Sequence, residues 1–306
     1  MAALVAACAL SGARTSPTAS AAVNTAFDAS RAFEHIRQLV AIGPRWPGSA
    51  GSTQARRYIT AQLEQAGLEP DEQAFTASTP LGPIQMANVT ALVRGERPER
   101  ILIGGHYDTK LFRQFRFVGA NDGGSSTAML LELARVLSRR KNPFSIELAF
   151  FDGEEALVEW WQDVDNTYGS RHYVEAARRA GSLRHIRAML LVDMVADRDL
   201  NIRRDTHSTR WLTDLIWAAA ARKGHQRHFV SESMAHEDDH LPFLRAGIPA
   251  VNVIDIDYAV WHTADDTLEH VSARSLQIVA DVLLEALPKI EERLLAQPAK
   301  QDKGRP

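Results

Sequence analysis

Residues 101–110 read ILIGGHYDTK, an apolar run that turns abruptly polar. The apolar part, at 101–105, has the length and composition of a short buried strand. A histidine and an aspartate follow it directly. In open α/β sheets, ligands bind just beyond the carboxyl ends of the strands. The stretch therefore predicts an α/β fold with its chemistry at the strand ends.

The alternation of strand and helix continues on both sides of this stretch. Helices are predicted at 28–41, 51–66, 127–137, 169–180, 211–222 and 272–295, and further strands at 72–76, 86–93, 146–151, 188–192 and 250–254. Such alternation is typical of a mainly parallel sheet covered on both faces. No repeat and no linker-like change of composition follows residue 25. We predict one domain at 26–306, built on a central, mixed, mainly parallel sheet with helices on both faces.

The composition is that of an ordinary folded protein, with 45% hydrophobic and 24% charged residues. Because the net charge is −3, nucleic acids and anionic membrane surfaces are not expected partners. A single cysteine, Cys8, excludes an internal disulfide and a cysteine-rich zinc module. We expect a monomer.

Residues 1–25 differ from the rest of the chain. A small apolar run ends at Cys8 and is followed by serine, threonine and alanine, which resembles the end of a bacterial lipoprotein signal. The run is short and lacks a basic start, so a disordered tail is the alternative interpretation. We predict an exported protein that is periplasmic, secreted or anchored by a lipid at Cys8.

Polar clusters accompany the other predicted strands and helices in the same way. One precedes the helix at 127–137 and three follow the strands at 146–151, 188–192 and 250–254, and they contain Asp122, Glu154, Glu155, Asp193 and His262. Histidine and carboxylate ligands suit zinc, and a catalytic zinc keeps three protein ligands and one open position. Asp122, Glu155 and His262 supply such a ligand set. The neighbouring Glu154 is then a base that does not bind the metal.

Each of these residues also has a purely structural interpretation. Asp122 precedes two glycines and could cap the helix at 127–137, a contact worth about 1 kcal/mol. Glu154 and Glu155 alone are typical of a solvated surface, and both can face one site only if Gly153 bends the strand end. The joint pattern favours a metal site, because unrelated caps need not supply a zinc ligand set at successive strand ends.

A second metal motif, H-E-x-x-H, occurs at 236–240, which reads HEDDH. In zincins, a helix presents these two histidines four residues apart. Two aspartates inside the motif and Pro242 just after it oppose a helix here. We therefore assign no zincin site to His236 and His240. The serine-hydrolase elbow G-x-S-x-G and the Walker P-loop are both absent from the sequence.

The polar segments resemble those of the zinc aminopeptidase superfamily and, within it, of the bacterial-type glutaminyl-peptide cyclotransferases (glutaminyl cyclases). The resemblance covers roughly residues 27–295, and its motifs are HYDTK at 106–110, FFDGEEA at 150–156, YGSRH at 168–172, DDHLPFL at 238–244 and VWHT at 260–263. The last two motifs are typical of cyclases rather than of ordinary aminopeptidases.

The resemblance implies an enzyme that converts the N-terminal glutamine of peptides and proteins to pyroglutamate and releases ammonia. It implies one Zn²⁺ per chain, held by Asp122, Glu155 and His262. The expected partners are peptides or proteins with an N-terminal glutamine.

The resemblance also implies roles for the residues around the metal. Glu154 would be the general acid and base, with Asp193 and Asp238 as its hydrogen-bonded acidic partners. Trp160 and Trp261 would form the walls of the substrate pocket.

A two-zinc aminopeptidase on the same fold is the main alternative. In that enzyme His106 and Asp193 would hold a second zinc, Asp122 would bridge the two ions, and Glu154 would activate a water molecule. In the cyclase, His106 would instead lie beside the substrate without binding metal. All the ligand positions are present, so the ligand residues alone leave both enzymes open.

The motifs at 238–240 and 261–262, which surround the ligand positions, favour the cyclase over the aminopeptidase. A non-catalytic binding protein with this fold is a third interpretation. It would have lost Glu154 or a metal ligand, and none of them is missing.

Overall fold

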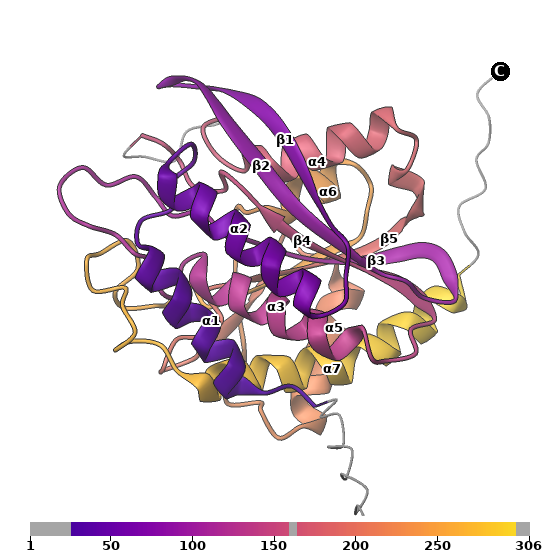
Figure 1. The fold of residues 1–306 in the computed structure, drawn as a ribbon. Helices are drawn as coiled ribbons and strands as arrows, with labels where there is room; N and C mark the ends of the chain where they lie inside the picture. Colours follow the sequence, from indigo (N-terminus) through magenta and orange to yellow (C-terminus); the bar gives the residue numbers. More distant parts are fainter. Residues whose placement is uncertain (1–25, 159–163, 298–306) are drawn as a thin grey trace, which may run out of the picture.

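The computed structural model describes residues 26–158 and 164–297 (Figure 1). Its centre is a six-stranded sheet in the order β1-β2-β4-β3-β5-β8. The segment 1–25 with Cys8, where we predict an export signal, lies outside the described residues, and so does Trp160. Those two interpretations stay predictions.

The six strands combine a parallel core with an antiparallel edge. They are β1 (Pro70–Thr79), β2 (Gly82–Val93), β3 (Arg97–His106), β4 (Phe144–Phe151), β5 (Ile186–Asp193) and β8 (Ala250–Ile254). β4, β3, β5 and β8 are parallel neighbours, whereas β1 and β2 form a hairpin that pairs antiparallel to β4. The predicted mixed, mainly parallel sheet is confirmed.

Helices cover both faces of this sheet, as predicted. They are α1 (Ala29–Ile42), α2 (Ala50–Gln65), α3 (Gly124–Leu137), α4 (Tyr168–Arg179), α5 (Arg210–Arg222), α6 (His240–Arg245) and α7 (Ala273–Leu295). Figure 1 shows α4 and α6 above the central strands and α3 and α7 below them. A second, small parallel sheet of β6 (Ile202–Asp205) and β7 (Phe229–Met234) was not predicted.

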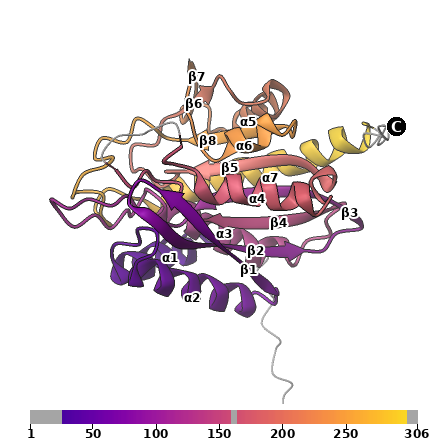
Figure 2. The same ribbon diagram turned by 90° about the horizontal axis from the view of Figure 1, so that it is seen from above.

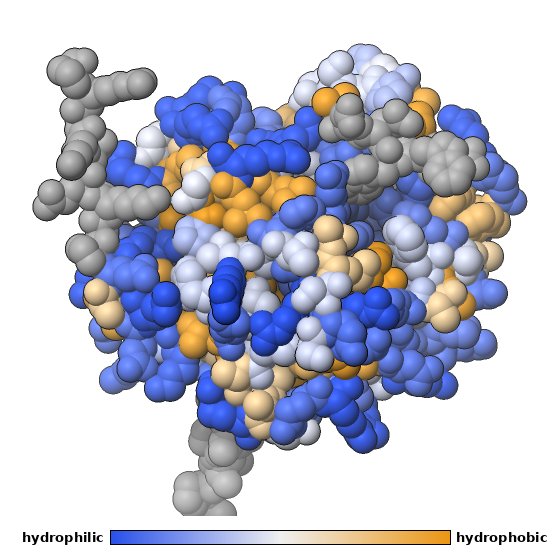
Figure 3. Space-filling model, turned by 180° about the vertical axis from the view of Figure 1, so that it is seen from behind, coloured by the Kyte–Doolittle hydropathy of each residue, from blue (hydrophilic) through white to orange (hydrophobic). Residues whose placement is uncertain are grey.

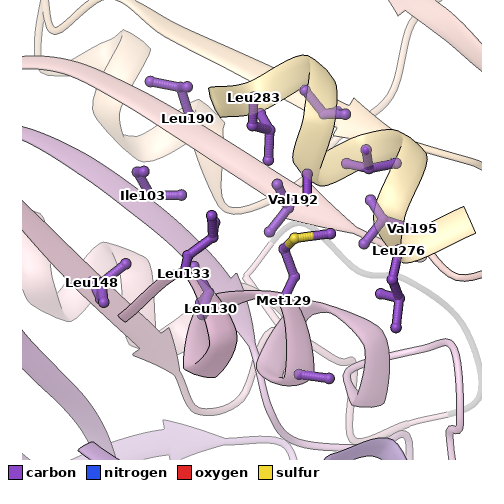
Figure 4. Packing of buried hydrophobic residues seen from close by; sticks show 14 of the residues in the cluster. Ile103, Met129, Leu130, Leu133, Leu148, Leu190, Val192, Val195, Leu276 and Leu283 are labelled. Carbon is purple, nitrogen blue, oxygen red and sulfur yellow. The ribbon is translucent and has the colours of Figure 1, made fainter. Parts of the chain in front are cut away.

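Alternating side chains of β3 build the two apolar layers. Ile101 and Ile103 pack in the large cluster with α3 and α7, while Leu102 packs in the cluster with α4 and α6. Figure 4 shows the larger layer, where Met129 of α3 and Leu276 of α7 approach the sheet from the same face. Burial on both faces explains why the strand reads as a continuous apolar run.

The parallel strands all end at the same edge of the sheet, and their loops gather there. Both ribbon views place the loop that follows β3 and the loop that follows β8 on the same side of the molecule (Figures 1 and 2). The face seen from behind is mostly hydrophilic, with apolar side chains in separate patches (Figure 3). Within the two described ranges, no helix has both the length and the apolar character needed to cross a bilayer.

The buried His35 in α1 makes the free energy of unfolding depend on pH. Its Nδ1 lies 2.6 Å from the hydroxyl of Tyr58, and burial, with a smaller effect from Arg31, lowers its pKa from 6.5 to about 4. Protonation of His35 therefore favours the unfolded chain. Above pH 6.5 His35 is neutral in both states and its titration does not affect the free energy of unfolding, which then decreases as the pH falls towards 4. In urea titrations we expect a loss of about 3 kcal/mol over this range relative to His35→Gln.

The control for this prediction is His270→Gln, which replaces an exposed histidine. This variant should follow the wild-type stability at every pH. If His35→Gln lost as much stability as the wild type between pH 6.5 and 4, a neutral, buried His35 would be excluded.

Candidate active site

Three side chains from three separate loops meet at the edge of the sheet. Asp122, Glu155 and His262 each offer a ligand atom, and these atoms lie within 4.8 Å of one another. Nε2 of His262 is 2.9 Å from Oε1 of Glu155 and 3.3 Å from Oδ2 of Asp122. The structure thus brings together the ligand set expected from the sequence.

A sharp bend after β4 directs two consecutive glutamates into the same site. Gly153 has a φ of +70°, and a Cβ atom there would lie 2.7 Å from Sδ of Met86, so only glycine fits. The carboxylate of Asp108 accepts hydrogen bonds from the backbone N–H groups of Glu154 and Glu155, at 3.1 and 3.3 Å. The two hydrogen bonds to Asp108 therefore hold the backbone in the bend that follows β4.

Asp122 does not act as a helix cap. The N-cap of α3 is Gly123, and no side chain donates or accepts a capping hydrogen bond there. Instead, Asp266 accepts hydrogen bonds from the backbone N–H groups of Asn121 and Asp122, at 2.8 and 3.1 Å. These contacts leave the carboxylate of Asp122 free to face His262.

The electrostatics of this cluster fit a bound cation. Although burial lowers it, the carboxylates of Glu155 and Asp122 raise the pKa of His262 to about 10. Oδ2 of Asp122 is buried and, among the described residues, has no hydrogen-bond donor. Two buried carboxylates thus attract a positive charge, which a metal ion can supply in place of the proton. Imidazole and carboxylate groups both bind zinc, and a catalytic zinc has three protein ligands, the number that this cluster offers.

A second group of ligand atoms shares Asp122. Nε2 of the fully buried His106 lies 3.1 Å from Oδ1 of Asp193 and 3.2 Å from Oδ1 of Asp122, while its Nδ1 is 3.4 Å from Asp108. These atoms are also close enough together to hold a metal ion. The geometry therefore accommodates both the one-zinc and the two-zinc arrangement. The side chain of His106 contacts the carboxylates of Asp122 and Asp193 but is not among the residues that line the cavity.

A cavity of about 280 Å³ opens beside the metal-ligand cluster. Met194, His236 and Glu237 line this cavity although the sequence assigned them no role in the site. The complete lining is Asp122, Glu154, Glu155, Asp193, Met194, His236, Glu237, Trp261 and His262. The indole of Trp261 stacks on the imidazole of His262, with the ring centroids 4.2 Å apart. Trp261 is thus placed to form a wall of a substrate pocket.

Glu154 is buried at the bottom of an acidic environment. Burial raises the pKa of its carboxyl group well above the ordinary value; His106 opposes this, and the negative charges of Asp238 and Glu155 add to it. Within the described ranges no hydrogen bond joins Glu154 to Asp193 or Asp238. Asp193 lies against His106, and Asp238 accepts a hydrogen bond from Nδ2 of Asn252 at 2.8 Å. In this conformation, Asp238 acts on Glu154 through its charge.

The structure confirms that the H-E-x-x-H motif is not a zincin helix. α6 begins only at His240, with Pro242 in its first turn, and His236 lies before the helix. Proline is tolerated in the first turn because the backbone N–H groups there have no partner within the helix. The two histidines therefore do not share a helix face.

Sequence reasoning missed Lys110, which supports the metal-ligand cluster. Its ammonium group is buried, donates a hydrogen bond to the backbone oxygen of Ala156 at 3.0 Å and lies 3.8 Å from Oε2 of Glu155. The signal was present, because Lys110 ends the polar run that follows β3. From the sequence alone, a lysine in that position is expected at the surface. The structure shows that the loop after β4 covers it.

Comparisons with known proteins place this site in a family. The model of peptidase family M28 matches residues 88–287. A glutaminyl-peptide cyclotransferase-like protein of Bos taurus is 33% identical over 267 residues, which cover 76% of this chain and 68% of that protein.

Solved structures of both a glutaminyl cyclase and an aminopeptidase superimpose on this chain. A glutaminyl cyclase of an Acidobacteriales bacterium superimposes with a TM-score of 0.83 at 39% identity, over 92% of this chain and 100% of that one. A leucine aminopeptidase precursor from Bacteroides thetaiotaomicron superimposes with a TM-score of 0.79 at 25% identity, over 87% and 99%. The chain belongs to peptidase family M28 and, within it, to the glutaminyl-peptide cyclotransferases.

Proposed function

We propose that this chain is a zinc-dependent glutaminyl-peptide cyclotransferase that uses a single zinc ion, held by Asp122, Glu155 and His262. It converts the N-terminal glutamine of peptides to pyroglutamate and releases ammonia. The buried carboxyl group of Glu154 shares a cavity with the ligand cluster but contributes no atom to it, and it supplies the acid–base group that the reaction needs. The observation that favours the cyclase is the 39% identity to the Acidobacteriales glutaminyl cyclase over 92% of this chain. The family assignment supports the same activity.

The reaction is an intramolecular aminolysis. The α-amine of the substrate attacks the δ-carbon of its own side-chain amide, so that a C–N bond closes a five-membered ring and the bond to the amide nitrogen breaks. When bound, the zinc supplies Lewis-acid polarisation of the side-chain carbonyl group. Since both reacting groups belong to one residue, the cavity has only to hold that residue folded, and this can contribute much of the rate.

Glu154 carries the proton. It accepts a proton from the attacking amine and returns it to the departing amide nitrogen, which leaves as ammonia. Its burial and its acidic neighbours, Asp238 and Glu155, raise its pKa and so favour proton uptake. Asn252 holds Asp238 in place beside it through the hydrogen bond from Nδ2.

The pocket wall has the second task of excluding water. Trp261 lines the cavity and stacks on His262, so its indole covers the metal-ligand cluster on the open side. Water that reached the polarised amide would hydrolyse it to glutamate instead of allowing the ring to close. The same wall holds the substrate side chain against the ligands.

A two-zinc aminopeptidase remains the second candidate because the group of His106, Asp122 and Asp193 also meets the distance requirement for a metal ion. In that reaction Glu154 would activate water, and the peptide bond after the first residue would break. The two candidates therefore give different products from the same peptide.

Product analysis on a peptide with an N-terminal glutamine distinguishes them. We expect one ammonia per peptide, a peptide mass reduced by one ammonia and no free amino acid. The matched peptide with an N-terminal asparagine should not react, because its shorter side chain cannot form the five-membered ring. Release of free glutamine from the first peptide would contradict the cyclase and establish the aminopeptidase.

A further inference from the structure

Three side chains outside the active-site cluster form another group of ligand atoms. They are Asp205 at the end of β6, His207 in the loop that follows, and His240 at the start of α6. One ligand atom of each lies within 4.8 Å of the other two. His240 is the second histidine of the H-E-x-x-H motif and, unlike His236, does not line the active-site cavity.

His240 is a fully buried imidazole without a hydrogen bond. Its Nε2 lies 3.0 Å from Oδ2 of Asp205, but the contact lacks hydrogen-bonding geometry. Neither ring nitrogen has a hydrogen-bond partner in the part of the chain that the structure describes. Buried polar atoms almost always have a partner, and the rare exceptions include groups that bind an ion.

The carboxylate of Asp205 is held in one orientation. Its Oδ1 accepts hydrogen bonds from the backbone N–H groups of His207 and His236, both at 3.2 Å, and its Oδ2 accepts one from the hydroxyl of Ser208 at 2.6 Å. Hydrogen bonds of this kind orient the carboxylate ligands of metal sites.

His207 completes the group from the solvent side. Its side chain is 41% exposed, and its Nδ1 lies 3.0 Å from the backbone oxygen of His236 and 3.9 Å from Oδ1 of Asp205. A carbonyl oxygen can only accept, so Nδ1 donates and the lone pair of Nε2 is left for a cation. A ligating histidine typically donates its other nitrogen to a carbonyl group in this way.

We propose that Asp205, His207 and His240 bind a divalent transition metal of the zinc class, with water as the fourth ligand. Two imidazoles and one carboxylate suit such ions, whereas Mg²⁺ and Ca²⁺ prefer oxygen alone. In a tetrahedral zinc site the ligand atoms lie about 3.3 Å apart. Asp205 and His240 already have this spacing at 3.0 Å, and a ligand atom of His207 lies within 4.8 Å of both.

This cation would stabilise one wall of the active-site cavity. Its ligands tie β6 to the start of α6, and Asp205 and His207 also bind the backbone of His236. His236 and Glu237 line the cavity, and Asp238 follows directly. The site is nevertheless separate from the catalytic ligands, so it does not depend on the proposed reaction.

Zinc content tests the proposal on the full-length chain. We compare wild type, His207→Ala and the control His270→Ala after loading with zinc and removal of the excess. His207→Ala should hold one zinc equivalent fewer than wild type, whereas His270→Ala should match wild type. His207→Asp, which offers a carboxylate ligand in place of the imidazole, should recover the lost equivalent. The variants change an exposed residue, so all of them should fold.

The comparison also separates this site from the catalytic one. His262→Ala should lose its own equivalent independently, and the double variant with His207→Ala should lose both. Equal zinc content in wild type and His207→Ala would overturn the proposed site, whatever reaction the enzyme performs. In that case the contact between Asp205 and His240 serves only to join β6 to α6.

Discussion

Glu154→Gln is expected to lower turnover of glutaminyl peptides by ~10²-fold or more, because general acid–base catalysis contributes about this factor. The amide has the shape of the carboxyl group but cannot take up the proton of the attacking amine. Glu154 provides no ligand atom to the cluster of Asp122, Glu155 and His262. The variant should therefore keep its zinc and its affinity for substrate. Steady-state ammonia release and zinc content measure the two effects on the same preparation.

The control for this variant is Glu175→Gln on the exposed side of α4, where Glu175 pairs with Arg178 and Arg179. It should turn over substrate at the wild-type rate. If Glu154→Gln also retained wild-type turnover with full zinc occupancy, Glu154 would not be the proton carrier.

His262→Ala is expected to abolish both zinc binding at the active site and turnover. The variant removes the only imidazole of the cluster, whose Nε2 lies 3.3 Å from Oδ2 of Asp122 and 2.9 Å from Oε1 of Glu155. Polarisation by a metal ion is worth several kcal/mol in the transition state, so we expect turnover to fall by ~10²–10⁴-fold. Chelation of the metal from wild type should have the same effect, and added zinc should reverse it only in wild type.

The matched control for this variant is His270→Ala, in the same connection between β8 and α7 but exposed. It should keep its zinc and its turnover. Retention of both properties in His262→Ala would remove His262 from the metal site.

The buried strands and the amphipathic helices were predictable because burial imposes a pattern on the sequence. β3 extends from Arg97 to His106, whereas the sequence predicted only 101–105. Its first four residues read RPER and are exposed or half-buried, and a register shift interrupts their pairing with β4. The β1 strand was underestimated for a similar reason, since most of its residues are exposed or half-buried.

The short elements β6, β7 and α6 could not be predicted. β6 reads IRRD and has only its two ends buried, so it shows neither an apolar run nor a regular alternation. α6 contains Pro242, which argued against any helix there, yet the proline falls in the first turn. These elements depend on tertiary contacts, and Asp205 and His240 lie on them, with His207 in the loop that follows β6.

The ligand cluster was predictable because Glu155 and His262 come after strands, and Asp122 comes before a helix, whose positions are clear from the sequence. The interactions that orient them were not. Asp108, Asp266 and Lys110 act through backbone groups or at the edge of the cluster, and their partners lie between 45 and 145 residues away in the sequence. Only the folded chain shows which carboxylate faces a histidine and which holds a loop.

The central claim is that Asp122, Glu155 and His262 hold one cation with the carboxyl group of Glu154 beside it and unbound. Anomalous diffraction at the zinc absorption edge, from crystals of the zinc-loaded protein, tests this most directly. We expect a peak within about 2.0–2.2 Å of one atom of each of the three ligands, and no bond from Glu154 to it. The absence of a peak between these three side chains, or a peak bound by Glu154, would contradict the account.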